Sequence, residues 1–132
     1  MDKKFEIITF KDGDFSLPVN VSPTEDTVWL TLEEIGKLFD RDPSVIGKHI
    51  KNIYAEKEQN EFTSSAKNAV QINGQIHYIK IFNLDVIMSV GYRVKSPRGN
   101  LFRIWANSIL KHYMFQKQDC LECKEKIIDL QK

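Results

Sequence analysis

Alternating apolar and polar residues at the start of the chain predict a β-hairpin. Residues 5–10 (FEIITF) are rich in strand formers, the Asp-Gly dipeptide at 12–13 is a turn signal, and residues 15–21 (FSLPVNV) return with an apolar residue at every second position. Because Pro18 has no N–H to donate to a neighbouring strand, we expect the returning strand to lie at the edge of a sheet. A loop and a short apolar segment, residues 28–30, follow the hairpin.

Helical periodicity then replaces the strand pattern. Thr31 and Glu34 have the spacing of a capping box, which predicts a helix over residues 32–39. Pro43 disfavours helix at the residue before it and suits the first turn of a new one, so we expect a second helix from residue 43 or 44 to about residue 57. The buried stripe of this second helix would consist of Ile46, Ile50, Ile53 and Tyr54.

Two short helices separated by about four residues form the helix-turn-helix pattern. Gly36 supplies the small residue usual in the first helix, and Ile46 the buried aliphatic residue of the second. The turn position that often holds glycine is Asp40, which tolerates a left-handed backbone conformation at some cost. A plain helical corner within a core is the alternative interpretation of the same residues.

A second hairpin is predicted around Asn73-Gly74, with strands over residues 69–72 and 76–82. Apolar residues point to both sides of the later strand, so we expect it to be covered on more than one side, with His77 as a core residue. A strand, two helices and a hairpin follow one another in the order of a winged helix, whose second helix enters the major groove and whose hairpin touches neighbouring phosphates. We therefore expect an α+β, winged-helix-like fold followed by C-terminal helices.

Two longer helices complete the pattern. Asn83 can cap a helix over residues 84–92, whose apolar surface is too broad for a single amphipathic stripe, so most of its sides should be buried. Ser96 and Pro97 begin another helix, which we expect to continue, with or without a break, as far as residue 130.

Residues 1–117 are therefore expected to form a winged-helix-like DNA-binding domain. Residues 118–132 are expected to be a helical extension, used for dimerisation or representing a truncated linker. As a projecting helix this extension would leave four apolar side chains uncovered, which favours a homodimer: Leu121, Ile127, Ile128 and Leu130.

The formal net charge of the 132 residues is only +1, but the charge is unevenly distributed. Residues 1–40 hold 4 basic and 9 acidic residues, a net charge of −5, whereas residues 41–57 hold 4 and 2 (+2) and residues 83–118 hold 6 and 1 (+5). With 42% apolar residues the chain can bury a core as one domain. The separation of charge suits a protein that turns one face toward phosphates, and a solvated basic helix is the alternative.

The outward face of the second predicted helix carries groups that can contact base edges or phosphates. Its candidate DNA-binding residues are Ser44, Gly47, Lys48, His49, Lys51 and Asn52. Glycine among them would let the helix backbone approach the duplex closely. An ordinary solvated face is the alternative for the lysines.

Further candidates for phosphate contact lie later in the chain. They are Lys67 on the predicted hairpin, Arg93, Lys95 and Arg98 around the loop between the last two helices, and Arg103 on the final helix. The free N–H groups at a helix start also favour an anion at this loop. The alternative is that Arg98 and Arg103 pack and pair within the fold.

No residue pattern points to catalysis, a metal or a cofactor. The three histidines, His49, His77 and His112, have no recurring spacing to an acid or a cysteine, and the sequence contains no HExxH, GxSxG or phosphate-binding glycine-rich motif. Cys120 and Cys123 are interpreted as ordinary reduced thiols, with redox or intermolecular pairing as the alternative. Lacking a long apolar stretch, the chain is expected to act away from membranes, in the cytoplasm.

The block NLDVIMSVGYRVKSPRGNLFRIWA (residues 83–106), with VWLTLEEIGKLFDRDPSVIGKHIKNIY (residues 28–54) before it, closely resembles the RhuM family of bacterial virulence-associated proteins. The likeness extends over residues 26–114. The sequence is also, more distantly, similar to the BRO-N and KilA-N modules of phage antirepressors and viral DNA-binding proteins. It implies a DNA-associated role, often beside restriction-modification or mobile-element genes. Chains of this family usually run on, so the resemblance also implies an N-terminal fragment or a shortened member.

Taken together, these patterns predict a non-enzymatic module that binds double-stranded DNA. The alternative is a protein-interaction module, such as an antirepressor that grips a repressor through the same surface. A nuclease accessory domain is a third interpretation.

Overall fold

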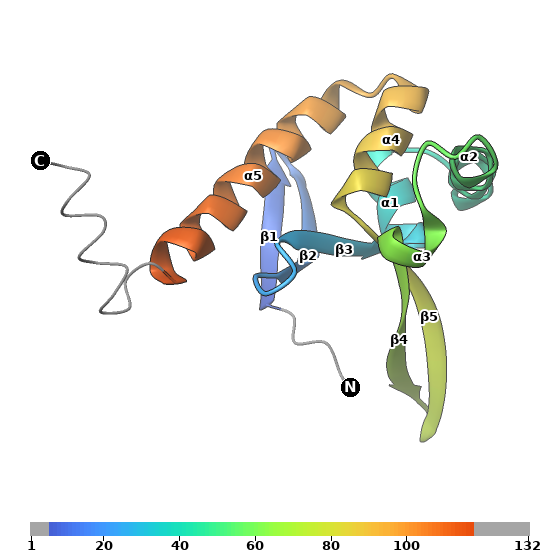
Figure 1. Cartoon of the computed structure of the whole chain (residues 1–132), viewed down its shortest axis with the longest axis horizontal. Helices are drawn as coiled ribbons and strands as arrows, with labels where there is room; N and C mark the ends of the chain where they lie inside the picture. The colour runs from blue at the N-terminus through green and yellow to red at the C-terminus, as the bar shows by residue number, and fades with distance from the viewer. Residues whose placement is uncertain (1–5, 118–132) are drawn as a thin grey trace, which may run out of the picture.

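Residues 6–117 are described in the computed structural model and form a mixed α+β fold (Figure 1). In chain order the elements are β1 (Glu6–Asp12), β2 (Phe15–Ser22), β3 (Thr27–Thr31), α1 (Leu32–Phe39), α2 (Pro43–Ala55), α3 (Glu61–Ser64), β4 (Ser65–Ile72), β5 (Gln75–Asn83), α4 (Leu84–Val94) and α5 (Pro97–Lys117). The strands form one antiparallel sheet in the order β1-β2-β3-β5-β4. The expected α+β class is thus confirmed.

Local signals explain where the helices begin. The Thr31 hydroxyl accepts from the Glu34 N–H at 3.2 Å, and the Glu34 carboxylate accepts from the Thr31 N–H at 2.8 Å, which completes the predicted capping box. The Asn83 side chain accepts from the Val86 N–H at 3.2 Å and caps α4, and α5 begins at Pro97, as expected. The second helix ends at Ala55, two residues before its expected end.

The short strand β3 joins the two hairpins of the sheet. It pairs with only three residues of β2 and with only three of β5, residues 81–83. By contrast, β4 and β5 pair along eight residues. Most of the second hairpin therefore lies beyond the continuous sheet and projects as a two-stranded ribbon (Figure 1).

The edge position expected for the strand that contains Pro18 is wrong, because β2 lies between β1 and β3. Proline is tolerated there because β3 pairs only with residues 20–22, at the far end of β2. Toward β1, Pro18 lies opposite Thr9, three positions from the Asp12–Phe15 pair that closes the turn. Antiparallel pairs alternate between hydrogen-bonded and non-hydrogen-bonded, so Pro18 occupies a position where no N–H is needed.

The expectation that the second strand of the later hairpin is covered on more than one side is also wrong. Residues 75–80 are all exposed, and His77 lies in solvent rather than in a core. Only Ile81 and Phe82, at the end of β5 that pairs with β3, are buried. The apolar residues along β5 suggest burial, but no other described element extends far enough along the strand to cover residues 75–80.

The helices and the sheet share one core. Phe102 of α5 is fully buried and packs edge-to-face on Phe10 of β1, with ring centroids 5.2 Å apart. Where α4 crosses α5, a Cβ on either Gly91 or Gly99 would lie 3.7 Å from the Cα of the other, and the buried ring of Phe39 from α1 fills the space beside them. The helix α4, expected to be buried on most sides, indeed contributes Val86, Ile87 and Val90 to this core.

The turn between α1 and α2 fits the helix-turn-helix pattern. Asp40 ends α1 in the left-handed conformation, with φ of 55°, and the Arg41 N–H donates to the Gly36 carbonyl at 2.9 Å. A Cβ on Gly36 would lie 2.8 Å from the Arg41 carbonyl oxygen, so this position must lack a side chain. Asp42 then caps α2 by accepting from the Ser44 N–H at 2.9 Å.

Replacing Asp40 tests the strain at this turn. Asp40→Gly should raise the free energy of unfolding by about 0.5–1 kcal/mol, because glycine adopts a positive φ without steric cost. Asp40→Ala should lower it, because alanine has the Cβ clash and lacks the local polar interactions of aspartate. Urea denaturation of the parent and both variants measures the difference, and equal stabilities for the glycine and alanine variants would contradict this account of the turn.

Candidate nucleic-acid interface

The helix α2 packs on the core with one face and presents the other to solvent. Ile46, Ile50 and Ile53 are buried against the remainder of the fold, as expected, and Tyr54 is half-buried. On the opposite face Ser44, Lys48, Lys51 and Asn52 are exposed. The helix sequence itself, PSVIGKHIKNIYA, contains no acidic residue. Its outward face therefore carries two lysines about one turn apart and no carboxylate.

Three predicted contacts on α2 are less open than the lysines. Gly47 and His49 are half-buried, and a Cβ on Gly47 would lie 3.9 Å from a methyl carbon of Leu32 in α1, an ordinary contact distance. The Ser44 hydroxyl donates to the Asp42 carboxylate, which also accepts from the Ser44 N–H and therefore has a lowered pKa. Three of the six candidates on α2 are exposed and do not bond to the N-cap residue Asp42: Lys48, Lys51 and Asn52.

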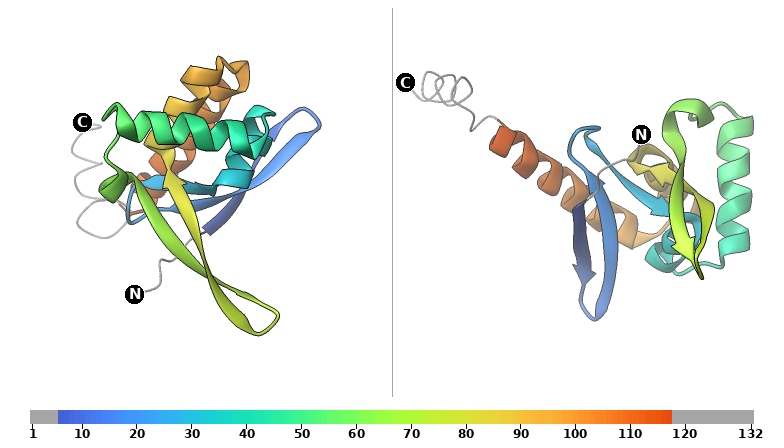
Figure 2. Two further views of the ribbon diagram at one scale, coloured as in Figure 1. Left: turned by 90° about the vertical axis from the view of Figure 1, so that its right-hand side faces the viewer. Right: turned by 90° about the horizontal axis from the view of Figure 1, so that it is seen from below.

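The β4–β5 hairpin extends from the side of the molecule on which α2 lies. In the left view of Figure 2, α2 crosses the front and the hairpin projects below it. Lys67 of β4 is exposed and lies opposite Lys80 of β5, which pairs with Glu61 of α3. Between Glu61 and Asp85 the sequence contains no carboxylate. The projecting hairpin can therefore approach a polyanion without acidic side chains of its own opposing it.

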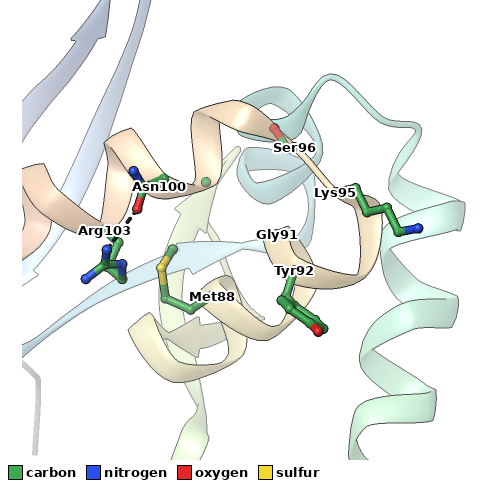
Figure 3. A pocket seen from close by; sticks show the side chains of 8 residues that line it. Met88, Gly91, Tyr92, Lys95, Ser96, Asn100 and Arg103 are labelled. Carbon is green, nitrogen blue, oxygen red and sulfur yellow. Dashed lines mark hydrogen bonds between the residues drawn. The ribbon is translucent and has the colours of Figure 1, made fainter.

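The corner between α4 and α5 contains a pocket of about 490 Å³ (Figure 3). Its lining residues are Met88, Gly91, Tyr92, Lys95, Ser96, Gly99, Asn100 and Arg103. Lys95, which ends α4 with φ of 56°, and Arg103 are both exposed at this corner. The Arg103 guanidinium donates to the Asn100 side-chain oxygen at 2.8 Å. Two of the predicted phosphate contacts thus remain accessible here.

Arg93 is held within the fold. Its Nη2 atom lies 3.0 Å from carboxylate oxygens of both Glu56 and Glu58, just after α2. Hydrogen bonds to these carboxylates raise the pKa of Arg93, and hydrogen bonds from Ser89 and then Arg93 lower the pKa of Glu58. The side chain of Arg93 is only 20% exposed. Its position ties α4 to the end of α2 and offsets one of the two negative charges of these carboxylates, beside the outward face of that helix.

Arg98 is also paired internally, which is the alternative that the sequence left open for this residue. Its Nε donates to Asp12 of β1 at 3.2 Å, and its Nη1 donates to the Leu38 carbonyl at 2.9 Å. The guanidinium carbon lies 4.0 Å from the centre of the Phe15 ring. These partners join the first hairpin, α1 and the start of α5 around one side chain.

Arg98→Ala should therefore lower the free energy of unfolding by about 1–2 kcal/mol, because the carbonyl bond, the ring contact and a partly screened ion pair are lost together. Thermal denaturation provides the measurement. Lys95→Ala, three residues earlier and exposed, is the matched control and should change stability by less than about 0.5 kcal/mol. Equal losses for the two variants would show that the Arg98 contacts do not stabilise the fold.

The residues that sequence reasoning missed are the acidic partners and the hairpin side chains. Glu56, Glu58 and Asp12 are far from their arginines in the sequence, so no local pattern identifies them. The exposed Ile76 and Tyr78 of β5 were interpreted as buried. One signal for this surface is present in the sequence: no carboxylate occurs between residues 61 and 85.

The described part of the chain contains no group of three or more His, Cys, Asp and Glu side chains that could hold a metal ion. His49, His77 and His112 lie on α2, β5 and α5 respectively. None of the helices between residues 6 and 117 combines the length and apolarity needed to cross a membrane. The predicted extension, with Cys120, Cys123 and the apolar residues proposed for dimerisation, lies outside the described residues.

Comparison with known proteins identifies one family model that matches part of the chain. No curated protein and no solved structure matched the chain, and the distant similarity to BRO-N and KilA-N modules gained no support. A family model, described as Virulence protein RhuM family, matches residues 59–122. That range includes the β4–β5 hairpin, α4 and α5 but starts after α2. The match covers 64 of the 132 residues, and over this range the chain is similar to the Virulence protein RhuM family.

Proposed function

We propose that this chain is a double-stranded DNA-binding module of the winged-helix type, with α2 as the recognition helix, the β4–β5 hairpin as the wing and no catalysis of its own. The observation that carries the proposal is the exposed face of α2, where Lys48 and Lys51 stand clear of any acidic residue on the helix, beside a hairpin without carboxylates. Both elements lie on the same side of the molecule (Figure 2).

The chemistry of α2 suits a major groove. The groove is about 12 Å wide and accepts one α-helix, and α2 is long enough, at about 20 Å, to follow it across several base pairs. Asn52 can donate to and accept from an adenine edge, whereas Lys48 and Lys51 can reach phosphates on either side of the groove. Lys67 at the base of the hairpin adds a cation for the neighbouring backbone.

Arg93 supports this surface indirectly. Glu56, which lies directly after α2, is exposed and would repel phosphates if it were uncompensated. The Arg93 guanidinium pairs with both Glu56 and Glu58 and so offsets one of their two negative charges.

Titration against a random-sequence duplex of about 30 base pairs tests the function. Three phosphate contacts, from Lys48, Lys51 and Lys67, predict an affinity that falls by about 40-fold between 50 and 200 mM salt. Fluorescence anisotropy with an end-labelled duplex measures it. Absence of binding at 50 mM salt would reject DNA as the partner.

A protein-interaction function, antirepressor-like and directed at a repressor or another protein, is the second candidate. The α4–α5 pocket favours it, because Tyr92 on its rim is 85% exposed and Lys95 and Arg103 flank the same hollow (Figure 3). Aromatic and arginine side chains beside a pocket are typical anchors of protein interfaces. In that case Tyr92→Ser would leave duplex binding intact and weaken binding to the partner protein.

A further inference from the structure

The projecting part of the β4–β5 hairpin is an isolated ribbon. Because β3 pairs only with residues 81–83 of β5, the six residues 75–80 have β4 as their single neighbour in the sheet. At about 3.3 Å per residue they extend some 20 Å from the sheet. All six are exposed, so the ribbon has no cover from the rest of the described chain.

The tip of this ribbon, residues 71–76 (QINGQI), is a tight turn with two exposed aliphatic side chains. Asn73 and Gly74 form a two-residue turn with φ of 52° and 78°, the geometry of a rigid type I′ hairpin. Ile72 and Ile76 flank the turn and are 47% and 65% exposed. Ile76 lies opposite Gln71 and Ile72 opposite Gln75, so successive pairs place the two isoleucines on opposite faces of the ribbon.

The two isoleucine side chains are not suited to contacting phosphates, which require cations or N–H donors. Exposed strands with apolar side chains are also a hazard that proteins normally suppress, so an uncovered tip of this kind indicates an apolar receptor. The ribbon carries no carboxylate of its own, and at its base Lys67 is exposed while Lys80 pairs with Glu61 of α3. A nucleic-acid duplex combines the two properties such a receptor needs, because its backbone is polyanionic and its stacked bases form an apolar interior.

Groove dimensions specify how the tip could enter. Two strands lie about 4.8 Å apart, so the ribbon with its side chains is wider than an undistorted minor groove of about 6 Å. The minor groove can therefore accept only the turn and its flanking side chains, and it must widen around them. Proteins that insert apolar side chains from the minor groove unstack a base step and bend the duplex by 20–90°.

On the basis of the DNA-binding function proposed above, we propose that the hairpin tip wedges the Ile76 side chain into a base step from the minor groove and bends the duplex. The step should be a flexible pyrimidine–purine one such as TA, which unstacks most readily. In the left view of Figure 2 the ribbon projects below and to one side of α2, so with α2 in a major groove it would lie along the duplex toward the neighbouring minor groove.

Bending is measured with a duplex of about 30 base pairs that has a central TA step and a donor and an acceptor dye at its ends. The parent chain should increase energy transfer on binding. Ile76→Gln should abolish the increase and weaken binding about tenfold while leaving the salt dependence unchanged, because no cation is lost. Ile79→Gln makes the same replacement further from the tip, at a side chain 37% exposed, and should bend the duplex as the parent does.

The outcomes separate the wedge from the DNA-binding function on which it rests. If the parent fails to bind at 50 mM salt, both fail. If it binds without increasing energy transfer, or if Ile76→Gln bends the duplex fully, the wedge is rejected and the DNA-binding function stands. If sedimentation shows a dimer that Ile76→Gln dissociates, the tip docks on a second copy of the chain, which also overturns the wedge. Far-UV circular dichroism checks that each variant is folded.

Discussion

Reversing both exposed charges of α2, with Lys48→Glu and Lys51→Glu together, should weaken duplex binding by at least about 100-fold at 50 mM salt. Two attractions to phosphate become two repulsions, and the low ionic strength screens neither fully. Both side chains are exposed and lie opposite the buried isoleucines of the helix, so the fold should be unaffected. Fluorescence anisotropy gives the affinity, and thermal denaturation confirms that stability changes by less than about 0.5 kcal/mol.

The matched control changes the net charge by the same amount elsewhere. Lys11 on β1 and Lys111 on α5 are exposed, and neither lies on α2 or on the β4–β5 hairpin. The double variant Lys11→Glu with Lys111→Glu should lower the affinity for the duplex by no more than about threefold, because it changes only the long-range electrostatic attraction between protein and DNA. If this control loses as much affinity as the α2 variant, binding follows total charge and α2 is not the contact surface.

Gly91→Ala should be the most destabilising single substitution of those considered. Its Cβ would lie 2.9 and 3.1 Å from two carbons of the Phe39 ring, which is 2% exposed and enclosed by core residues. Overpacking a rigid core contact of this kind costs about 2–3 kcal/mol, which for a domain of this size lowers the melting temperature by about 8–12 °C. Thermal denaturation measures it directly.

Gly99→Ala is the control for Gly91→Ala, since the two glycines face each other across the α4–α5 crossing. A Cβ on Gly99 would meet the Phe39 ring at 3.6 Å and the Gly91 Cα at 3.7 Å, which are ordinary contacts. We expect a change within about 1 kcal/mol, because a gain in helix propensity offsets any crowding. A Phe39→Leu replacement should recover part of the loss in the Gly91→Ala background but not in the Gly99→Ala background. Equal losses for both glycines would contradict the packing described.

Local signals predicted the elements well wherever a few neighbouring residues decide the conformation. The Thr31–Glu34 capping box, the Asn83 cap, Pro97 at a helix start and the Asn73–Gly74 turn all act within three or four residues, and each is found as expected. The four-residue helix α3 was missed because one turn has no periodicity to detect.

Long-range pairing is what the sequence could not supply. The internal position of β2 depends on β3, and the exposure of His77 depends on how far β3 extends along β5. Similarly, Arg93 and Arg98 look like available cations in the sequence, yet their partners lie 37 and 86 residues away, at Glu56 and Asp12. Charge counting located a basic region, and only the fold distinguishes its exposed lysines from its internally paired arginines.

The salt dependence of duplex binding by the parent chain and by Lys48→Ala with Lys51→Ala tests the central claim most directly. If α2 lies against the phosphates through these two lysines, the slope of log K against log salt concentration should become less steep by about 1.8, since each lost contact removes about 0.9. The curves should then converge at high salt. Parallel lines, with the same slope for parent and variant, would contradict α2 as the surface that binds DNA.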